Sequence, residues 1–367
     1  MAETLRRARP RDALDRVGLA LALAGVTSFV SVAIDAVPTH ADAAGPTDYL
    51  TEVVGISPEV PGISARILGG DSFIELTVAG RIEVIVLGYQ GEPYLRFTSS
   101  GEVLENDLSP SRYLNDDRYA GGTVPADADP DAAPRWRTIG SDGRWAWHDH
   151  RTHWMSAVPP LGLHRGDQIL DGAVPLLVDG AAVEVQVVSH WLPQPSTAPV
   201  VLALVVGFAA AATCLGPHRR RPQAVVAVVG VAGATALVVG AWQTRSLPAE
   251  TGPPIEAWAL PATALSFALV AALRRWSVFA RASLLLLAAV QLGVWAISRR
   301  STLTRAVLPT AAPFWLDRAV TTVTAVVALA GAATSAATVI GEMRPRPSDG
   351  FSGPHGLEQV GPGSGNA

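Results

Sequence analysis

The sequence predicts an α+β membrane protein, in which an antiparallel β-sandwich-like domain outside the cytoplasm precedes a five-helix transmembrane domain. Apolar residues gather in blocks of about 20 residues that are almost free of charge, the length that crosses a hydrocarbon core. Only 16% of the residues are charged, and the mean hydropathy is +0.28. Residues 44–195 differ, because several of their short segments alternate apolar and polar residues with the two-residue period of half-buried strands.

Residues 1–43 have the features of an export signal. Five arginines precede an apolar run from Val17 to about Ala36, and Ala41-Asp42-Ala43 supplies the small residues of a cleavage site. The length of the apolar run also fits an uncleaved signal anchor, which would give six spans in place of five. Both alternatives place the residues that follow outside the cytoplasm.

Residues 44–195 are predicted to form the β domain. Gly-rich turns such as Gly69-Gly70-Asp71 and Asp179-Gly180 separate its short alternating segments, a pattern typical of an antiparallel sandwich. Residues 106–142 are rich in Asp, Pro and Gly, and predict a long ordered loop or lid. The strand candidates are Ile63–Leu68, Phe73–Val78, Ile82–Leu87, Tyr94–Thr98, Arg144–His150, Ala173–Val178 and Ala182–Trp191.

The predicted β domain is acidic. It contains 21 Asp and Glu against 10 Arg, and so carries a net charge of about −11 with histidine neutral. Such a surface repels phosphate, which argues against a nucleic-acid partner, and it raises the local concentration of cations. The single cysteine, Cys214, lies in an apolar block, so the chain has no disulfide framework.

Residues 196–342 are predicted to form the membrane domain, and 343–367 a disordered cytoplasmic tail. Arginines gather near the N-terminus, in the first and third loops, and after the last span, which places these loops and both termini in the cytoplasm. The loops on the opposite side contain fewer arginines, namely Arg245, Arg299, Arg300 and Arg305. This orientation predicts a multi-pass plasma-membrane protein in contact with lipid. The five apolar blocks are residues 198–216, 223–242, 257–273, 282–298 and 319–341.

The apolar blocks contain almost no ionisable side chains. Gln291 and scattered Ser and Thr are their polar candidates, and hydroxyls and small residues such as Gly331 and Ser335 are typical of helix–helix packing. Transporters and redox proteins usually keep ionisable groups at membrane depth. We therefore interpret this half as an anchor or an assembly platform, with a weak conduit as the alternative.

The stretch Trp145–Met155 combines three histidines, three tryptophans and a methionine. If Arg144–His150 is a strand, His148 and His150 share one face, because alternate residues point the same way. His153 and Met155 follow closely and could complete a metal site. Imidazole suits copper, zinc, iron and nickel, and thioether sulfur selects copper(I), so this set favours copper. Asp149 could hold a ring N–H or act as a ligand.

A structural explanation of the same stretch is an aromatic core in which each imidazole has its own hydrogen bond, with Arg151 paired to Asp149 or stacked on Trp154. His190 could join a metal site if its strand were a neighbour, whereas His164 lies in a Gly-rich loop that favours exposure. Residues 127–138 begin like a calcium loop but lack its glycine and its final glutamate. We identify no catalytic residues and no organic cofactor site.

Three segments carry a resemblance: Val86–Arg96, Ser109–Asn115 and the run Trp147-His148-Asp149-His150-Arg151-Thr152-His153-Trp154-Met155. In these the chain resembles a family of uncharacterised actinobacterial membrane proteins, over most of residues 45–340. The resemblance implies a secreted β domain followed by a helical membrane domain, and supplies no activity. The N-terminal signal is also similar to that of periplasmic copper carriers of the CopC type, but the histidine that begins their mature chain is missing here.

The leading hypothesis is a membrane-anchored extracytoplasmic protein that binds or handles copper through His148, His150 and His153, with Met155 as a further ligand. The alternative is a scaffold subunit of a cell-envelope membrane complex, with the Trp-His stretch as its core. An envelope hydrolase or transferase is a third class, for which no nucleophile–base pair is recognisable. A metal site predicts imidazoles that converge on one point, a scaffold predicts rings buried singly, and an enzyme predicts a cleft with a perturbed acid or base.

Overall fold

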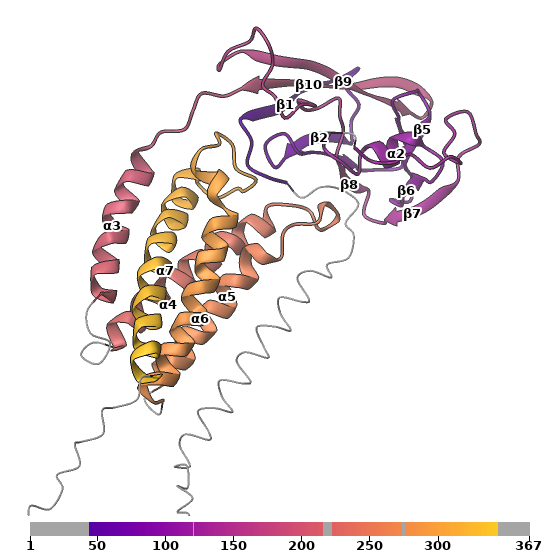
Figure 1. The fold of residues 1–367 in the computed structure, drawn as a ribbon. Helices are drawn as coiled ribbons and strands as arrows, with labels where there is room; N and C mark the ends of the chain where they lie inside the picture. The colour runs from indigo at the N-terminus through magenta and orange to yellow at the C-terminus, as the bar shows by residue number, and fades with distance from the viewer. Residues whose placement is uncertain (1–43, 120, 216–221, 274–275, 344–367) are drawn as a thin grey trace, which may run out of the picture.

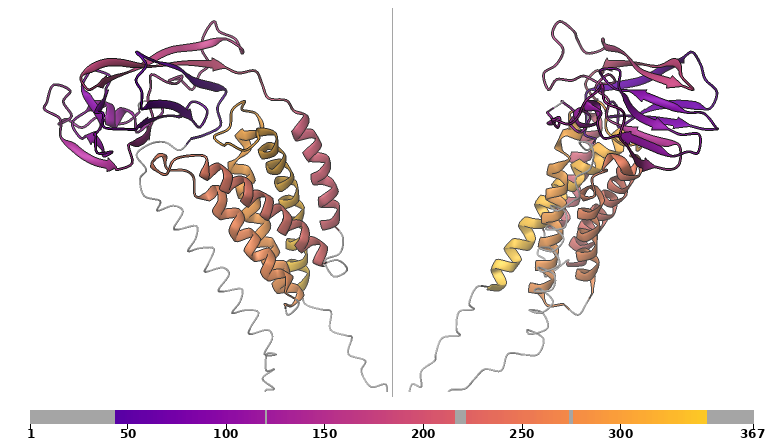
Figure 2. Two further views of the ribbon diagram at one scale, coloured as in Figure 1. Left: turned by 180° about the vertical axis from the view of Figure 1, so that it is seen from behind. Right: turned by 90° about the vertical axis from the view of Figure 1, so that its right-hand side faces the viewer.

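A computed structural model describes residues 44–119, 121–215, 222–273 and 276–343. The predicted export signal, the arginines of the first loop at 219–221, Arg274 and Arg275, and the tail from 344 lie outside these residues. The described chain forms a β domain that sits on one end of a bundle of helices (Figures 1 and 2).

The β domain contains two antiparallel sheets. The larger has seven strands in the order β1-β10-β9-β4-β5-β6-β7, and the smaller has three in the order β2-β3-β8. The strands are β1 Tyr49–Ser57, β2 Ile63–Leu68, β3 Phe73–Val78, β4 Val84–Leu87, β5 Pro93–Phe97, β6 Val103–Asn106, β7 Trp136–Gly140, β8 Arg144–Trp147, β9 Gln168–Val178 and β10 Ala181–Trp191.

The core of this domain lies between the two sheets. In β10, Val183, Val185 and Val187 are buried while the residues between them face outward, the alternation that predicted this strand. In β3 nearly every residue is buried, including Ile74 and Leu76. The antiparallel β domain expected at this end of the chain is therefore confirmed.

Three strands were not predicted, and one predicted strand ends early. β1, β6 and β7 lack a clean alternation, and β7 lies with the short helix α2 (Pro110–Leu114) in the segment 106–142 that was expected to be a loop. Because Asp- and Pro-rich segments flank β7, its five residues do not stand out as a strand in the sequence. β8 ends at Trp147 and not at His150, because the chain turns immediately afterwards.

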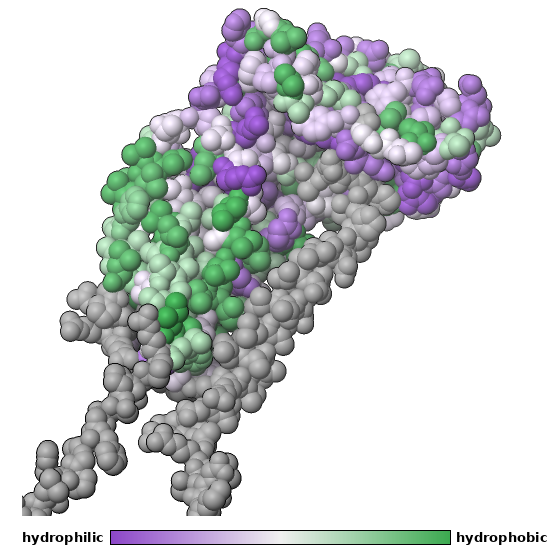
Figure 3. All heavy atoms as spheres, viewed as in Figure 1, coloured by the Kyte–Doolittle hydropathy of each residue, from purple (hydrophilic) through white to green (hydrophobic). Residues whose placement is uncertain are grey.

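Five helices form the second half: α3 Ala198–Cys214, α4 Pro222–Arg245, α5 Glu256–Ala272, α6 Val278–Ser298 and α7 Phe314–Met343. Three of them, α4, α6 and α7, are long and apolar enough to cross a membrane, and α3 and α5 are shorter apolar helices. Large apolar side chains are exposed on the bundle, as on α3 where Leu202 is 66% exposed. Figure 3 shows this apolar surface against the hydrophilic surface of the β domain.

Two short 3-10 helices, η1 (Ala249–Thr251) and η2 (Arg300–Leu303), lie in the loops that face the β domain. Thr47 and Val307 form an antiparallel bridge with N···O distances of 3.0 and 2.8 Å. Beside it, Asp48 accepts hydrogen bonds from the guanidinium of Arg305 (2.8 Å) and from the backbone N–H of Ala306 (3.0 Å). Backbone pairing and an ion pair thus hold the two halves together.

The helix bundle is more polar at this end than the sequence predicted. α7 begins at Phe314, five residues before the predicted block, so Asp317 and Arg318 lie inside the helix and are buried. Arg299 donates to Asp317 (2.5 Å) and to the amide oxygen of Gln243 on α4. A sequence-based search does not find this cluster, because its members come from α4, from the residue that follows α6, and from α7.

Candidate metal centre

The turn after β8 brings His148, His150 and His153 together. β8 pairs with β3 as far as Trp147, opposite Ile74. The carbonyl of Asp149 then accepts the backbone N–H of Thr152 (3.0 Å) and its hydroxyl (2.8 Å), which closes a tight turn. Thr51 on β1 fixes the far side of the turn by donating its hydroxyl to the Thr152 carbonyl (2.8 Å).

The three imidazoles converge on one point. One nitrogen of each ring can be chosen so that all three lie within 4.8 Å of one another. Ring centroids are 4.4 Å apart for His148 and His153, 5.8 Å for His148 and His150, and 5.6 Å for His150 and His153. Convergence was the predicted signature of a metal site, although it is reached by a turn and not by alternation along a strand.

Each ring gives one nitrogen to a backbone carbonyl. His148 donates from Nδ1 to Ser72, His153 from Nδ1 to Trp154 (3.1 Å), and His150 from Nε2 to Asp117 (2.8 Å). A carbonyl can only accept, so the bonded nitrogen must carry the proton and the other nitrogen holds a lone pair in the neutral ring. Such bonds fix the tautomer and the ring orientation of metal-binding histidines.

Two of the remaining nitrogens are buried without a partner. The Nε2 atoms of His148 and His153 make no hydrogen bond within the described part of the chain, although the residues are only 2% and 0% exposed. Burying an unsatisfied polar atom costs about 1–3 kcal/mol. A metal ion that accepts both lone pairs would remove this cost.

Burial also keeps the rings neutral. It lowers the pKa of His148 to about 4 and that of His153 to about 2, and the nearby positive charge of Arg118 acts in the same direction. At neutral pH both rings therefore have the unprotonated nitrogen that a metal requires. Arg118 is held in place by a two-point ion pair with the buried Asp71, at 3.1 and 2.5 Å.

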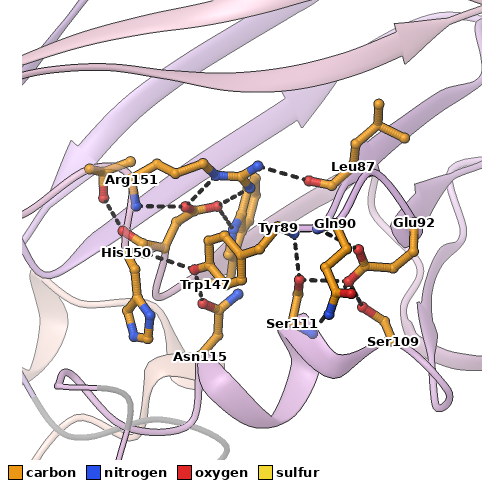
Figure 4. Close-up of polar contacts among 12 residues, drawn as sticks. Leu87, Tyr89, Gln90, Glu92, Ser109, Ser111, Asn115, Trp147, His150 and Arg151 are labelled. Carbon is orange, nitrogen blue, oxygen red and sulfur yellow. Dashed lines mark hydrogen bonds and ion pairs between the residues drawn. The ribbon is translucent and has the colours of Figure 1, made fainter. Parts of the chain in front are cut away.

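Asp149 makes no hydrogen bond to the imidazoles within the described residues and is not a member of the converging group, contrary to the expectation that it would hold a ring N–H or act as a ligand. Its carboxylate accepts the indole N–H of Trp147 (3.0 Å) and three bonds from Arg151, at 3.0 Å from the backbone and 2.8 and 2.7 Å from the guanidinium. Burial alone would raise the pKa of Asp149, but Arg151 and Trp147 lower it below its ordinary value. The pair is a structural support behind the turn (Figure 4).

Tyr89 connects this support to the three histidines. Its ring stacks on His150 with centroids 5.6 Å apart and an angle of 12°, and its hydroxyl accepts the backbone N–H of His150 (2.8 Å) and donates to Asn115. Ser111 accepts the backbone N–H of Tyr89 (2.8 Å) and donates to the buried Glu92 (2.7 Å), as Figure 4 shows. No local pattern in the sequence indicates these roles, because the partners of Tyr89 lie 22 to 61 residues away along the chain.

The other candidate ligands lie apart from the three rings. His190, on β10, is not a member of the group whose nitrogens converge, and the His164 side chain is 88% exposed, as its loop predicted. Met155 is 37% exposed, and its role as a ligand stays a prediction.

The three histidines fit a transition-metal ion. Atoms that are all within 4.8 Å of one another lie within about 2.8 Å of a common point, against the ~2.0–2.1 Å of a zinc–nitrogen bond. A contraction of roughly 1 Å or less would therefore bring all three into coordination. Three protein ligands leave at least one coordination position open, as in metal sites that exchange ligands.

No protein-family model, no curated protein and no solved structure matches this chain. The resemblance to an uncharacterised membrane-protein family therefore stays a prediction, and the function must be argued from the site itself.

Proposed function

We propose that this protein is a membrane-anchored metal-handling protein that binds copper through His148, His150 and His153. The observation that carries this proposal is the pair of buried, unpartnered Nε2 atoms on neutral rings that converge with a third imidazole. An aromatic-histidine core would need no such convergence, and would leave two polar atoms unsatisfied at a cost.

Copper is preferred to zinc for two reasons. Imidazole binds both metals, but a thioether selects copper(I), and Met155 follows His153 by two residues. A structural zinc site is also almost always closed by four protein ligands, whereas three imidazoles are present here; a catalytic zinc held by three histidines is an outcome that the metal titration distinguishes. Met155 is proposed as a fourth, weaker ligand that reaches the ion when the site is loaded.

The membrane arrangement is part of the proposal. All five helices would cross the plasma membrane, with the β domain on the extracytoplasmic side and the C-terminus in the cytoplasm. The candidate spans and the exposed apolar surface of the bundle support membrane insertion. The distribution of arginines supports the orientation.

A scaffold function is the second candidate. It is favoured by the backbone hydrogen bond that each imidazole makes and by the burial of Trp147, which is 4% exposed. In that case the three rings would only stiffen a surface that another envelope or membrane protein contacts.

Equilibrium metal binding separates the two. The full chain in detergent is titrated with copper(I), copper(II) and zinc, beside the double variant His148→Ala/His150→Ala and the control His164→Ala. We expect one copper per chain for the wild type and the control, and none for the folded double variant. A well-folded wild type that binds no metal would refute the metal-handling proposal and favour the scaffold.

A further inference from the structure

A cavity of about 280 Å³ lies next to the metal centre, between the β domain and η1. Its wall includes His148, aromatic side chains of β3, β5 and β8, and Thr138 on β7. Glu250 and Thr251 of η1 contribute from the membrane half. Of the three histidines, His148 is the one that reaches this wall.

A metal ion needs a way in, since His148 and His153 are 2% and 0% exposed. The cavity supplies such an entrance at His148, one of the two rings whose Nε2 has no partner within the described residues. Asn115, another residue of the wall, is 3% exposed, and its amide contacts the hydroxyl of Tyr94. An unsatisfied ring nitrogen in a wall with several polar side chains indicates a space that holds water or a small polar ligand.

The charges of the wall favour a cation. Glu105, Asp116 and Glu250 face two guanidinium groups, those of Arg112 and Arg137. Arg112 and Arg137 each form ion pairs with both Glu105 and Asp107. The Arg112–Glu105 and Arg137–Asp107 distances are both 3.2 Å. Three carboxylates against two guanidinium groups leave the lining with a formal charge of −1, which raises the local concentration of cations.

We propose that this cavity is the passage through which a hydrated metal cation reaches His148, and that the open coordination position of the three-histidine site faces it. The inference rests on the proposed metal-binding function. Because η1 belongs to the helical half, the membrane domain closes one side of the passage and sets how fast the ion exchanges.

Stopped-flow tryptophan quenching by Cu²⁺, with the full chain in detergent, tests this passage. Thr251→Trp fills the cavity without altering a ligand. Its matched control is Thr304→Trp, in the loop between α6 and α7 that contains η2. We expect Thr251→Trp to lower both the association and the dissociation rate constants at least tenfold while Kd changes less than threefold. Thr304→Trp should match the wild type.

A second pair of variants tests the charge. Asp116→Asn/Glu250→Gln should slow association about three- to tenfold, with a weaker salt dependence, whereas Glu184→Gln/Asp171→Asn on the outer face of β9 and β10 should not. If Thr251→Trp does not fold, the passage is tested by Thr138→Trp on the edge strand β7 and by Asp116→Asn/Glu250→Gln.

The outcomes distinguish this inference from the proposed function. Binding by the wild type that is lost in His148→Ala/His150→Ala, with unchanged rates in the cavity variants, would overturn the passage and leave the metal site standing. A wild type that binds no Cu²⁺ at equilibrium would overturn both.

Discussion

At the scale of residues, the site depends on backbone carbonyls that fix the tautomers of its histidines. Ser72, Asp117 and Trp154 supply these carbonyls from three separate segments. The spacing of the three histidines could be found in the sequence, but these partners could not, because a backbone carbonyl leaves no trace in residue type. The stacking of Tyr89 on His150 could not be found in the sequence either, because only the fold brings the two rings together.

Tyr89→Phe should weaken metal binding about tenfold, within the 10- to 100-fold range that outer partners of metal ligands contribute. The variant keeps the stacked ring but loses the hydroxyl that accepts the His150 N–H and donates to Asn115. Competition with a chromophoric chelator measures the affinity. Tyr113→Phe, which removes a hydroxyl bonded to the Asp107 carbonyl (3.0 Å), should leave it unchanged.

Asp149→Asn should destabilise the β domain by about 3–5 kcal/mol, because it leaves the largely buried Arg151 without its charge partner. Asp142→Asn removes one partner of an exposed ion pair with Arg144, and should cost less than about 1 kcal/mol. Denaturant unfolding followed by tryptophan fluorescence compares the two. Equal effects would mean that Asp149 does not support the turn.

At the scale of elements, regular patterns were easy to predict and irregular ones were not. The strand β10 follows its two-residue period closely, and the five apolar blocks coincide with helices to within five residues at each end. β1 and β7 do not alternate cleanly, and they are strands because neighbouring strands pair with them. β8 was predicted three residues too long, since the turn that ends it is fixed by Thr51 on another strand.

Close helix packing was predicted from small residues, and among the described helical glycines Gly240 on α4 makes the closest approach to a neighbouring helix. A Cβ atom at this position would lie 1.7 Å from the Ala257 carbonyl oxygen of α5. Gly240→Ala should therefore separate the two helices and lower the thermal stability of the protein in detergent. At Gly341 on α7 a Cβ would meet nothing within 4 Å. Gly341→Ala should therefore leave the free energy of unfolding unchanged or raise it by up to about 1 kcal/mol. Equal stability of the two variants would contradict the packing.

At the scale of the whole molecule, the β domain is attached through Asp48 as well as through the chain. Burial would raise the pKa of Asp48, but hydrogen bonds from Arg165, Ala306 and Arg305 outweigh it and lower the pKa below 3.8. A depressed carboxyl pKa stabilises the folded contact above the unfolded value, and the stabilisation is lost as the pH falls through the folded pKa.

Hydrogen exchange can follow this attachment. The N–H groups of Thr47 and Val307 should exchange faster than the intrinsic acid dependence explains as the pH falls from about 4 toward the lowered pKa of Asp48, because the protonated carboxyl no longer attracts Arg305 as a charge partner. Asp48→Asn should produce the same loss of protection at pH 7, and Asp171→Asn should not. Protection that is unchanged in Asp48→Asn would show that the bridge alone holds the two halves together.

The domain order could be predicted from the sequence, but the way in which the two halves meet could not. Asp48 and Arg305 are 257 residues apart, and the buried Arg299–Asp317 pair joins two helices through side chains that the sequence placed outside the spans. Long-range pairing of this kind depends on the assembled bundle, and no local pattern contains it.

X-ray absorption at the copper edge of the loaded full chain tests the metal centre most directly. Coordination by His148, His150 and His153 predicts about three imidazole nitrogens near 2.0 Å, with one fewer in His153→Ala and no change in His164→Ala. A copper spectrum without imidazole scattering, or one that His153→Ala leaves unaltered, would contradict it.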